Sequence, residues 1–217
     1  MHVFKNRLDA GRQLAQALPE RVLAGRAVVL ALPRGGVPVG WEVARARGLP
    51  FDICVVRKLG VPGHRELAMG AIAANGVLVV ERGVVAAERV SDAHFTQVLN
   101  AERDELTRRE ARYRAGEPPL DLAARTVIVV DDGMATGASL KAALRAIRAQ
   151  RPAMLVVAVP VAPAGAAQEF DAEPIDAFVC LRAPSLFFSV GQYYEDFREV
   201  DDTVVRACLD EARRIAQ

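Results

Sequence analysis

The sequence predicts an open α/β fold in which a twisted parallel sheet is flanked by helices. The first reason is a set of short apolar runs that are continuous rather than alternating, as is typical of strands buried on both faces. These runs are Ala27–Leu32, Phe51–Val56, Thr126–Val130, Met154–Val161 and Ala177–Leu181. The second reason is that helical patterns lie between them, and strand–helix alternation favours parallel strands joined by right-handed crossovers.

The helices are predicted from apolar periodicity and from the residues at their ends. One follows the first strand, one follows the third, and a weaker one follows the fourth: Val37–Gly48, Gly137–Gln150 and Pro163–Phe170. The long charged stretch Ser91–Tyr113 has one apolar face and can be capped by Ser91 or Asp92. The N-terminal stretch and Asp201–Ala216 are predicted to be further amphipathic helices.

One segment departs from the strand–helix alternation. Ala71–Val80 carries Asn75-Gly76 between two short apolar arms. This pair of residues is typical of a two-residue turn, so the segment predicts a β-hairpin.

The composition excludes several classes of protein. The chain has 217 residues, 52% of them hydrophobic, and a net charge of +1, which gives no overall attraction to nucleic acid or membranes. No secretory signal and no apolar run of roughly eighteen residues is found, so no membrane partner is expected. Cys54, Cys180 and Cys208 are odd in number and widely spaced, which indicates reduced thiols in a cytoplasmic protein.

The most informative stretch is Thr126–Leu140, where a buried strand, a loop of small residues and a helix follow one another. Free backbone N–H groups at a helix N-terminus favour an anion. Asp131 and Asp132 end the strand, and carboxylates there suit sugar hydroxyls, bound directly or through Mg²⁺. A single acidic residue at this place would more often cap a turn. The whole order of features predicts a phosphorylated sugar as ligand.

This stretch resembles the 5-phosphoribosyl 1-pyrophosphate (PRPP) motif of the type I phosphoribosyltransferase family. The motif has four apolar residues, two acidic residues, two mostly apolar residues, and then a small residue, Thr, Gly, any residue and Thr or Ser. The matching residues are Val127–Val130, Asp131-Asp132, Gly133-Met134 and Ala135–Ser139. Gly133 departs from the pattern, because an aliphatic residue is usual there.

The resemblance implies a type I phosphoribosyltransferase-like fold and a Mg²⁺-dependent PRPP site. The 5′-phosphate would bind to Ala135, Thr136, Gly137, Ala138 and Ser139. The ribose would bind to Asp131 and Asp132, which would reach the metal through ribose hydroxyls or water.

Two further segments resemble the pyrophosphate-binding parts of the family. Arg34, Gly35 and Gly36 follow the first strand, and the resemblance implies that they bind pyrophosphate and that the Arg34–Gly35 peptide is cis. Arg57 and Lys58 are expected at the end of the second strand, at the same edge of the sheet. The alternatives are a turn with a solvated arginine and a pair of exposed charges.

The segment Leu59–Leu67 corresponds to a mobile lid that closes over PRPP in this family. His64 or Arg65 would then contact the leaving group. The alternative is an ordinary surface loop.

The C-terminal segment Ala183–Arg198 resembles the hood that covers the base in purine-type members. Phe187 and Phe188 would stack on the base, and Val190 and Gly191 would line its pocket. The alternative is a satellite hydrophobic cluster.

Together these features predict a single phosphoribosyltransferase-like domain over residues 1–217. Its core covers about 20–182, a hood covers about 183–200 together with the N-terminal helix, and a C-terminal helix covers 201–216. Dimers are common in such families, so a homodimer is allowed. Arginines 108, 109, 112 and 114 are interpreted as a solvated helix face, so no nucleic-acid partner is expected.

The expected reaction is transfer of a phosphoribosyl group from PRPP to a nitrogenous base or amine with release of pyrophosphate. The catalytic residues would be Asp131, Asp132, Arg34 and Lys58. Hypoxanthine/guanine-type members carry an acceptor-binding Asp where this chain has Ala135, which argues against a 6-oxopurine acceptor. Two alternatives stay open: a regulatory protein that senses PRPP or nucleotides on the same fold, and another phosphosugar enzyme.

Overall fold

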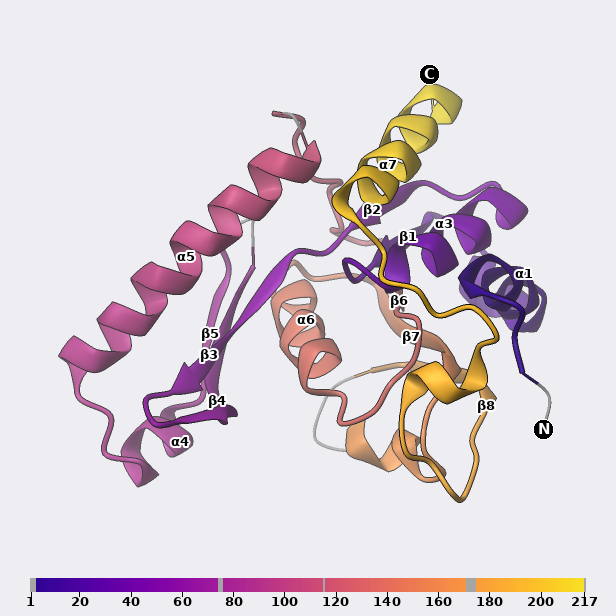
Figure 1. The fold of residues 1–217 in the computed structure, drawn as a ribbon. Helices are drawn as coiled ribbons and strands as arrows, with labels where there is room; N and C mark the ends of the chain where they lie inside the picture. Colours follow the sequence, from indigo (N-terminus) through magenta and orange to yellow (C-terminus); the bar gives the residue numbers. More distant parts are fainter. Residues whose placement is uncertain (1–2, 74–75, 115, 171–174, 217) are drawn as a thin grey trace.

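The central sheet of this computed structural model is parallel and has five strands in the order β2-β1-β6-β7-β8. The structure describes residues 3–73, 76–114, 116–170 and 175–216. The strands are β1 (Ala27–Ala31), β2 (Phe51–Ile53), β6 (Thr126–Val130), β7 (Met154–Val161) and β8 (Ala177–Arg182). The predicted fold class is therefore confirmed (Figure 1).

The continuous apolar runs arise because both faces of this sheet are covered. Every residue of β1 and β6 is buried. Val29 and Ile128 belong to the hydrophobic cluster on one face, whereas Val28 and Val127 belong to the cluster on the other. A strand covered on both faces needs apolar side chains at consecutive positions.

Helices cover the two faces of the sheet (Figure 1). The helices α1 (Arg7–Ala17), α3 (Gly36–Arg47) and α7 (Asp202–Ala216) contribute Leu14, Val39 and Val205 to one cluster. The opposite cluster receives apolar residues from α6 (Ala138–Arg148) and from η1 (Ala166–Phe170). Two elements differ from the predictions. A short helix, α2 (Glu20–Leu23), was not predicted, and the helix expected over 163–170 is only a five-residue 3-10 helix, η1.

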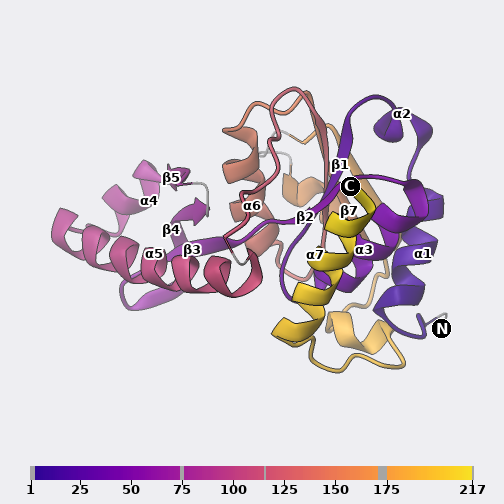
Figure 2. The same cartoon turned by 90° about the horizontal axis from the view of Figure 1, so that it is seen from above.

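A second, antiparallel sheet has the order β3-β4-β5. Its strands are β3 (Val56–Val61), β4 (His64–Ala73) and β5 (Leu78–Val80), and α4 (Arg82–Ala87) and α5 (Asp92–Arg114) follow it. We call β3–β5, α4 and α5 the arm. Figure 2 shows the arm extending to one side of the parallel sheet.

One prediction about the arm was wrong. Val56 begins β3 and does not end the second parallel strand, because β2 stops at Ile53 and the chain crosses to the other sheet. The alternative of an ordinary surface loop for Leu59–Leu67 does not hold, because β3 and β4 pair across Gly63, whose φ is +84°. The hairpin expected around residue 76 is confirmed by the pairing of β4 with β5; Asn75 lies outside the described residues.

The N-terminus pairs with the C-terminal hood segment. The Phe4 N–H donates to the Tyr193 carbonyl at 2.8 Å, and the Glu195 N–H donates to the Phe4 carbonyl at 2.9 Å. Tyr193 ends η2 (Val190–Tyr193), a 3-10 helix inside the hood. Among the described residues, no helix has both the length and the apolar character needed to cross a bilayer.

Candidate phosphoribosyl site

The loop between β6 and α6 carries the two predicted carboxylates and the predicted phosphate-binding residues. Asp131 and Asp132 come directly after β6 and are half-buried. Helix α6 begins at Ala138, and its N-cap is Gly137, with φ +69° and ψ 4°. That left-handed conformation favours glycine. Thr136 is exposed just before the helix, and its hydroxyl accepts a long hydrogen bond from the Ala138 N–H at 3.5 Å. The first N–H groups of a helix have no partner within the helix, so this end of α6 favours an anion.

The loop between β1 and α3 packs closely against these carboxylates. A Cβ atom on Gly35 would lie 2.1 Å from Asp132 Oδ2, and one on Gly36 would lie 2.7 Å from the Val130 carbonyl oxygen. Side chains at these two positions would push the loop away from the carboxylates. The sequence-predicted pyrophosphate loop therefore does lie beside the predicted ribose-binding residues.

The predicted position of the cis peptide was wrong. The cis bond joins Pro33 and Arg34, not Arg34 and Gly35. Gly35 already has helical angles, with φ −58° and ψ −38°, and the Arg34 carbonyl accepts a hydrogen bond from Val37 N–H at 3.1 Å. The Arg34–Gly35 peptide is thus part of the first turn of α3, in which peptides are trans.

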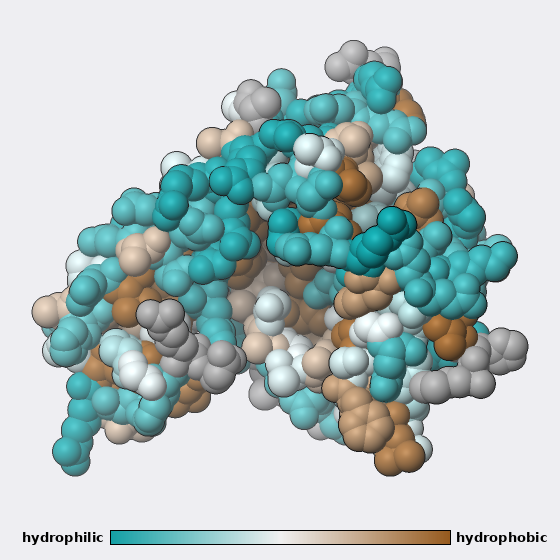
Figure 3. Space-filling model, in the orientation of Figure 1, coloured by the Kyte–Doolittle hydropathy of each residue, from teal (hydrophilic) through white to brown (hydrophobic). Residues whose placement is uncertain are grey.

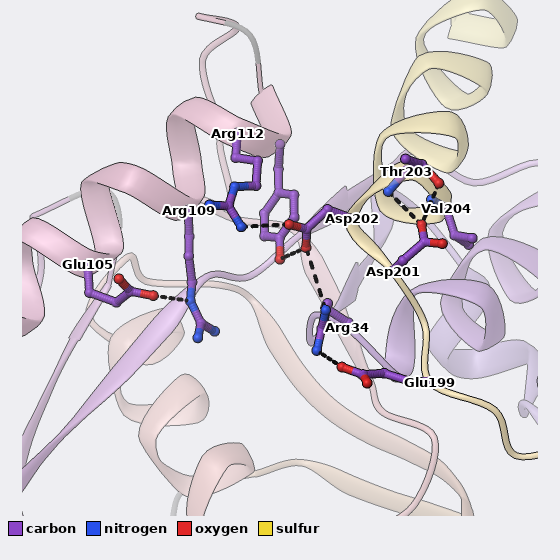
Figure 4. A network of polar contacts seen from close by, with 10 residues as sticks. Arg34, Glu105, Arg109, Arg112, Glu199, Asp201, Asp202, Thr203 and Val204 are labelled. Carbon is purple, nitrogen blue, oxygen red and sulfur yellow. Dashed lines mark hydrogen bonds and ion pairs between the residues drawn. The ribbon is translucent and has the colours of Figure 1, made fainter.

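Arg34 is held by carboxylates from the C-terminal part of the chain (Figure 4). It forms an ion pair with Glu199, and its Nη1 atom lies 4.0 Å from Asp202 Oδ1. Asp202 also accepts hydrogen bonds from Arg112 Nη1 at 2.7 Å and from the Tyr113 hydroxyl at 2.8 Å. Asp202 therefore connects the Arg34 loop with α5 of the arm.

A cavity of about 790 Å³ separates the arm from these loops. Figure 3 shows the molecule hollowed here, with apolar residues at depth and polar residues at the rim. Arg57 and Lys58 line it from β3, Ser139 lines it from α6, and Arg109 lines it from α5. The first two lie inside β3 rather than at the end of a parallel strand, and they share the cavity with Ser139 of the predicted phosphate-binding residues. Arg57 Nε also bonds Glu102 of α5 at 2.6 Å.

The interpretation of the α5 arginines as a solvated face was wrong for Arg114, whereas the side chains of Arg108 and Arg112 are exposed and Arg109 pairs with Glu105 on the same helix. Arg109 lines the cavity, and Arg112 bonds Asp202. Arg114 is buried and bonds both carboxylate oxygens of Asp52, at 2.7 and 2.9 Å. Only Arg108 has a largely exposed side chain without a partner from another element among those described. Helical periodicity cannot show this, because the partners come from β2 and α7.

Asp131 and Asp132 are unusual for neighbouring acids because they are withdrawn from solvent. Burial raises the pKa of Asp131 well above its usual range, and the charge of Asp132 raises it further. Burial also raises the pKa of Asp132, whereas the guanidinium of Arg7 opposes that rise. A nearby cation therefore favours the ionised form of both acids.

Two residues of the site were not predicted from the sequence. Arg7, at the start of α1, places Nε and Nη2 each 2.8 Å from Asp132 Oδ2. Tyr194, in the hood, donates its hydroxyl to the Asp132 carbonyl at 2.5 Å. They lie 125 and 62 positions away from Asp132 along the chain, so no local pattern could associate them with it.

The hood covers the β6–α6 loop, and its four predicted base-binding residues have different surroundings. Val190 packs on Gly133, and Phe187 stacks on Tyr193 with ring centroids 5.8 Å apart. Phe188 is 84% exposed. A Cβ on Gly191 would meet the ring of Phe197 at 2.9 Å, so this glycine permits close packing inside the hood.

The two predicted lid residues stand on β4 rather than on a loop. The side chain of His64 is exposed and lies 3.5 Å from Glu88. The neighbouring Gly63 lines the cavity, but His64 does not. The side chain of Arg65 lies outside the described residues.

Comparison with known proteins defines the class. The family model for the phosphoribosyl transferase domain matches residues 3–197. This chain therefore belongs to the phosphoribosyl transferase domain family, and the resemblance inferred from the PRPP motif is confirmed.

Individual relatives agree with this membership. Two Mycobacterium tuberculosis proteins, "Putative phosphoribosyl transferase MT0597" and "Putative phosphoribosyl transferase Rv0571c", are each 47% identical over 215 residues, which is 99% of this chain. The chain spans 48% of the length of each of these relatives. The crystal structure of TT1426 from Thermus thermophilus is 42% identical, with a TM-score of 0.87, over 96% of this chain and 98% of that one.

Proposed function

We propose that this protein transfers a phosphoribosyl group from PRPP to a nitrogenous base or amine and releases pyrophosphate. The observation that carries the proposal is the β6–α6 loop, where two carboxylates and a helix N-terminus lie a few residues apart beside the cavity. A ligand with hydroxyls at one end and a phosphate at the other suits this arrangement.

The predicted PRPP-binding residues have separate roles in this scheme. Residues 135–139 would bind the 5′-phosphate, and Asp131 and Asp132 would hold the ribose hydroxyls. Arg34, Arg57 and Lys58, with the N–H group of Gly35, would take up the charge of the pyrophosphate. The N–H of Gly36, also predicted to bind it, already donates to the Leu32 carbonyl at 3.1 Å. The reaction is displacement at C1′ through an oxocarbenium-like transition state, so the protein mainly positions the reactants and stabilises charge.

The residues present fit Mg²⁺ as the metal. Magnesium in proteins is usually bound through one or two carboxylates together with phosphate oxygens of the substrate, and the site offers Asp131 and Asp132. Within the described part of the chain, no group of three or more His, Cys, Asp or Glu could hold a metal by itself. Mg²⁺ would neutralise the leaving pyrophosphate, and the two acids would hold it through ribose hydroxyls or water.

The choice of acceptor depends on Ala135 and on the hood. The side chain of Ala135 cannot exchange a proton with a base, and of the hood residues Phe187, Phe188, Val190 and Gly191 only the backbone groups are polar. This favours an acceptor other than a 6-oxopurine. The same observation supports a second candidate function, a PRPP- or nucleotide-sensing regulator with little catalysis.

The remaining predictions complete the proposal. The chain would form one domain with a core, a hood and a C-terminal helix. The protein would be a cytoplasmic homodimer whose ligands are small molecules. The free thiols of Cys54, Cys180 and Cys208 are compatible with a reducing compartment.

Calorimetric titration of PRPP with and without Mg²⁺ tests the proposal. We expect Mg²⁺-dependent binding in the wild type and its loss in the Asp131→Asn/Asp132→Asn double variant. Asp176→Asn is a matched control, because this partly exposed acid lies next to β8 and pairs with Arg148 rather than with the site.

Screening bases and amines for pyrophosphate release then separates the enzyme from the regulator. Binding without release for any acceptor favours the regulator. If the folded protein does not bind PRPP at millimolar concentration, both candidate functions are excluded.

A further inference from the structure

We propose that Arg7 is a positioning residue for the transfer reaction: it fixes the carboxylate of Asp132 so that one oxygen stays directed to the ribose hydroxyls. This inference rests on the proposed function. It adds the N-terminal helix and the hood to the residues that determine how tightly PRPP binds.

The geometry of the contact supports a fixed orientation. Arg7 Nε and Nη2 both lie 2.8 Å from the same atom, Asp132 Oδ2. Only 11% of the Arg7 side chain and 14% of the Asp132 side chain is exposed. A guanidinium that binds through two nitrogens at low exposure restrains a carboxylate more than a solvated pair does.

The guanidinium itself is immobilised by the hood. Arg7 Nη1 donates to the Arg198 carbonyl at 2.8 Å, and its Cζ atom lies 3.9 Å from the centre of the Phe197 ring. The hydroxyl of Tyr194 meanwhile holds the Asp132 carbonyl at 2.5 Å. The hood therefore holds both the backbone and, through Arg7, the side chain of Asp132.

One oxygen of Asp132 remains available for a ligand. Oδ2 faces Arg7 and the backbone of Gly35, where a Cβ atom would lie 2.1 Å away. Among the described residues, no hydrogen bond uses Oδ1, whereas Oδ1 of the neighbouring Asp131 accepts from the Asp132 N–H at 2.8 Å. Because Arg7 bonds the oxygen on the loop side, it can stay in place while a ribose hydroxyl bonds the other.

A competing arrangement would give the opposite result. If Arg7 occupied the place of the ribose hydroxyls, PRPP would have to displace it, and removing Arg7 would tighten binding. If Arg7 positions Asp132, removing it weakens binding. The sign of the change in the PRPP dissociation constant separates the two.

The variants are Arg7→Gln, Arg7→Lys and Arg7→Ala, titrated with PRPP in the presence of Mg²⁺. We expect Arg7→Gln to bind about ten- to a hundredfold more weakly, the range seen when a residue that orients a ligand-binding side chain is removed. Arg7→Lys should recover part of the loss. Low, non-denaturing concentrations of methylguanidinium should partly rescue Arg7→Ala, which a change in folding alone would not produce.

Arg12→Gln is the matched control. Arg12 lies on the same helix and pairs with Glu42, which Arg45 also bonds at 2.9 Å, so Glu42 keeps a partner in the variant. Its PRPP affinity should equal that of the wild type. An Arg7→Gln protein that is folded and binds PRPP as tightly as the wild type, or more tightly, overturns the proposal, as does equal weakening by Arg12→Gln.

A measurement without ligand separates this proposal from the proposed function. If the wild type does not bind PRPP, the proposed function fails, and amide exchange in the free protein decides the role of Arg7. Faster exchange at Asp132 and Gly133 in Arg7→Gln, but not in Arg12→Gln, supports positioning. Unchanged exchange overturns it.

Discussion

The side chain of Val190 occupies the space that a side chain on Gly133 would need. A Cβ atom on Gly133 would lie 2.5 Å from Val190 Cγ1 and 3.0 Å from Val161 Cγ1. Gly133 is the one position where the PRPP motif departs from the family pattern, which usually has an aliphatic residue. In this chain the aliphatic group at this place comes from the hood instead, so the departure from the motif is compensated in space.

This contact predicts a coupled pair of substitutions. Gly133→Ala should lower the free energy of unfolding by roughly 1–3 kcal/mol, as overpacking of a core does. The double variant Gly133→Ala/Val190→Ala should lose less unfolding free energy than the two single variants lose in sum, because the second substitution removes the clash. Urea unfolding of the four proteins of this cycle measures the coupling, and strictly additive losses would contradict it.

The pairing of Arg34 with Glu199 predicts a variant that binds PRPP more tightly. Glu199 is exposed and pairs with Arg34. If Arg34 binds pyrophosphate as proposed, Glu199 competes for it, so Glu199→Gln should tighten Mg²⁺-dependent PRPP binding. The gain should be about two- to fivefold, since an exposed ion pair stabilises by up to roughly 1 kcal/mol. It should shrink in high salt.

Glu195→Gln is the control for this gain, because Glu195 is an exposed acid of the same segment and lies four residues earlier. Calorimetry at low and high salt distinguishes the two variants. Equal affinities for Glu199→Gln and the wild type would mean that Arg34 does not meet the pyrophosphate.

The buried pair of Arg114 and Asp52 predicts a large loss of stability. Arg114 Nη2 also donates to the Ile53 carbonyl at 2.8 Å, so the side chain joins α5 to β2. Arg114→Met leaves the buried carboxylate without its cation and should cost about 3–5 kcal/mol of unfolding free energy. Arg108→Met, on the exposed side of the same helix, should cost far less; similar losses would show that the ion pair does not anchor the arm.

Cys54 lines the cavity, and its thiol should be slow to react. Burial raises the pKa of Cys54 to about 12, and the charge of Asp52 contributes to the rise. The thiol is therefore almost wholly protonated at pH 8, where an ordinary cysteine with a pKa of about 8.5 is partly thiolate. Alkylation of the native protein at this position should be slow at pH 8 and should accelerate as the pH rises towards that pKa, whereas labelling in urea should be fast. Peptide mass spectrometry measures both rates.

The parallel sheet and the β6–α6 loop could be predicted from the sequence because their causes are local. Consecutive apolar residues in Thr126–Val130 reflect burial of β6 on both faces. The loop and the start of α6 that follow, Asp131–Ser139, depend on small residues next to one another in the sequence. The hairpin around Gly76 is local in the same sense, since a two-residue turn depends on its own residues. Helices α1, α3 and α6 followed from periodicity for the same reason.

Tertiary structure alone decided how the site is held. Arg7 and Tyr194 reach Asp132, Glu199 and Asp202 reach Arg34, and Val190 reaches Gly133, each from a distant part of the chain. Such contacts depend on where whole elements pack, and no period or spacing in the sequence encodes them. The sequence by itself determined the class of the protein and the residues that we propose to face its ligand. The packing of the N-terminal helix, the hood and the arm decided which charges lie beside these residues and how they are oriented.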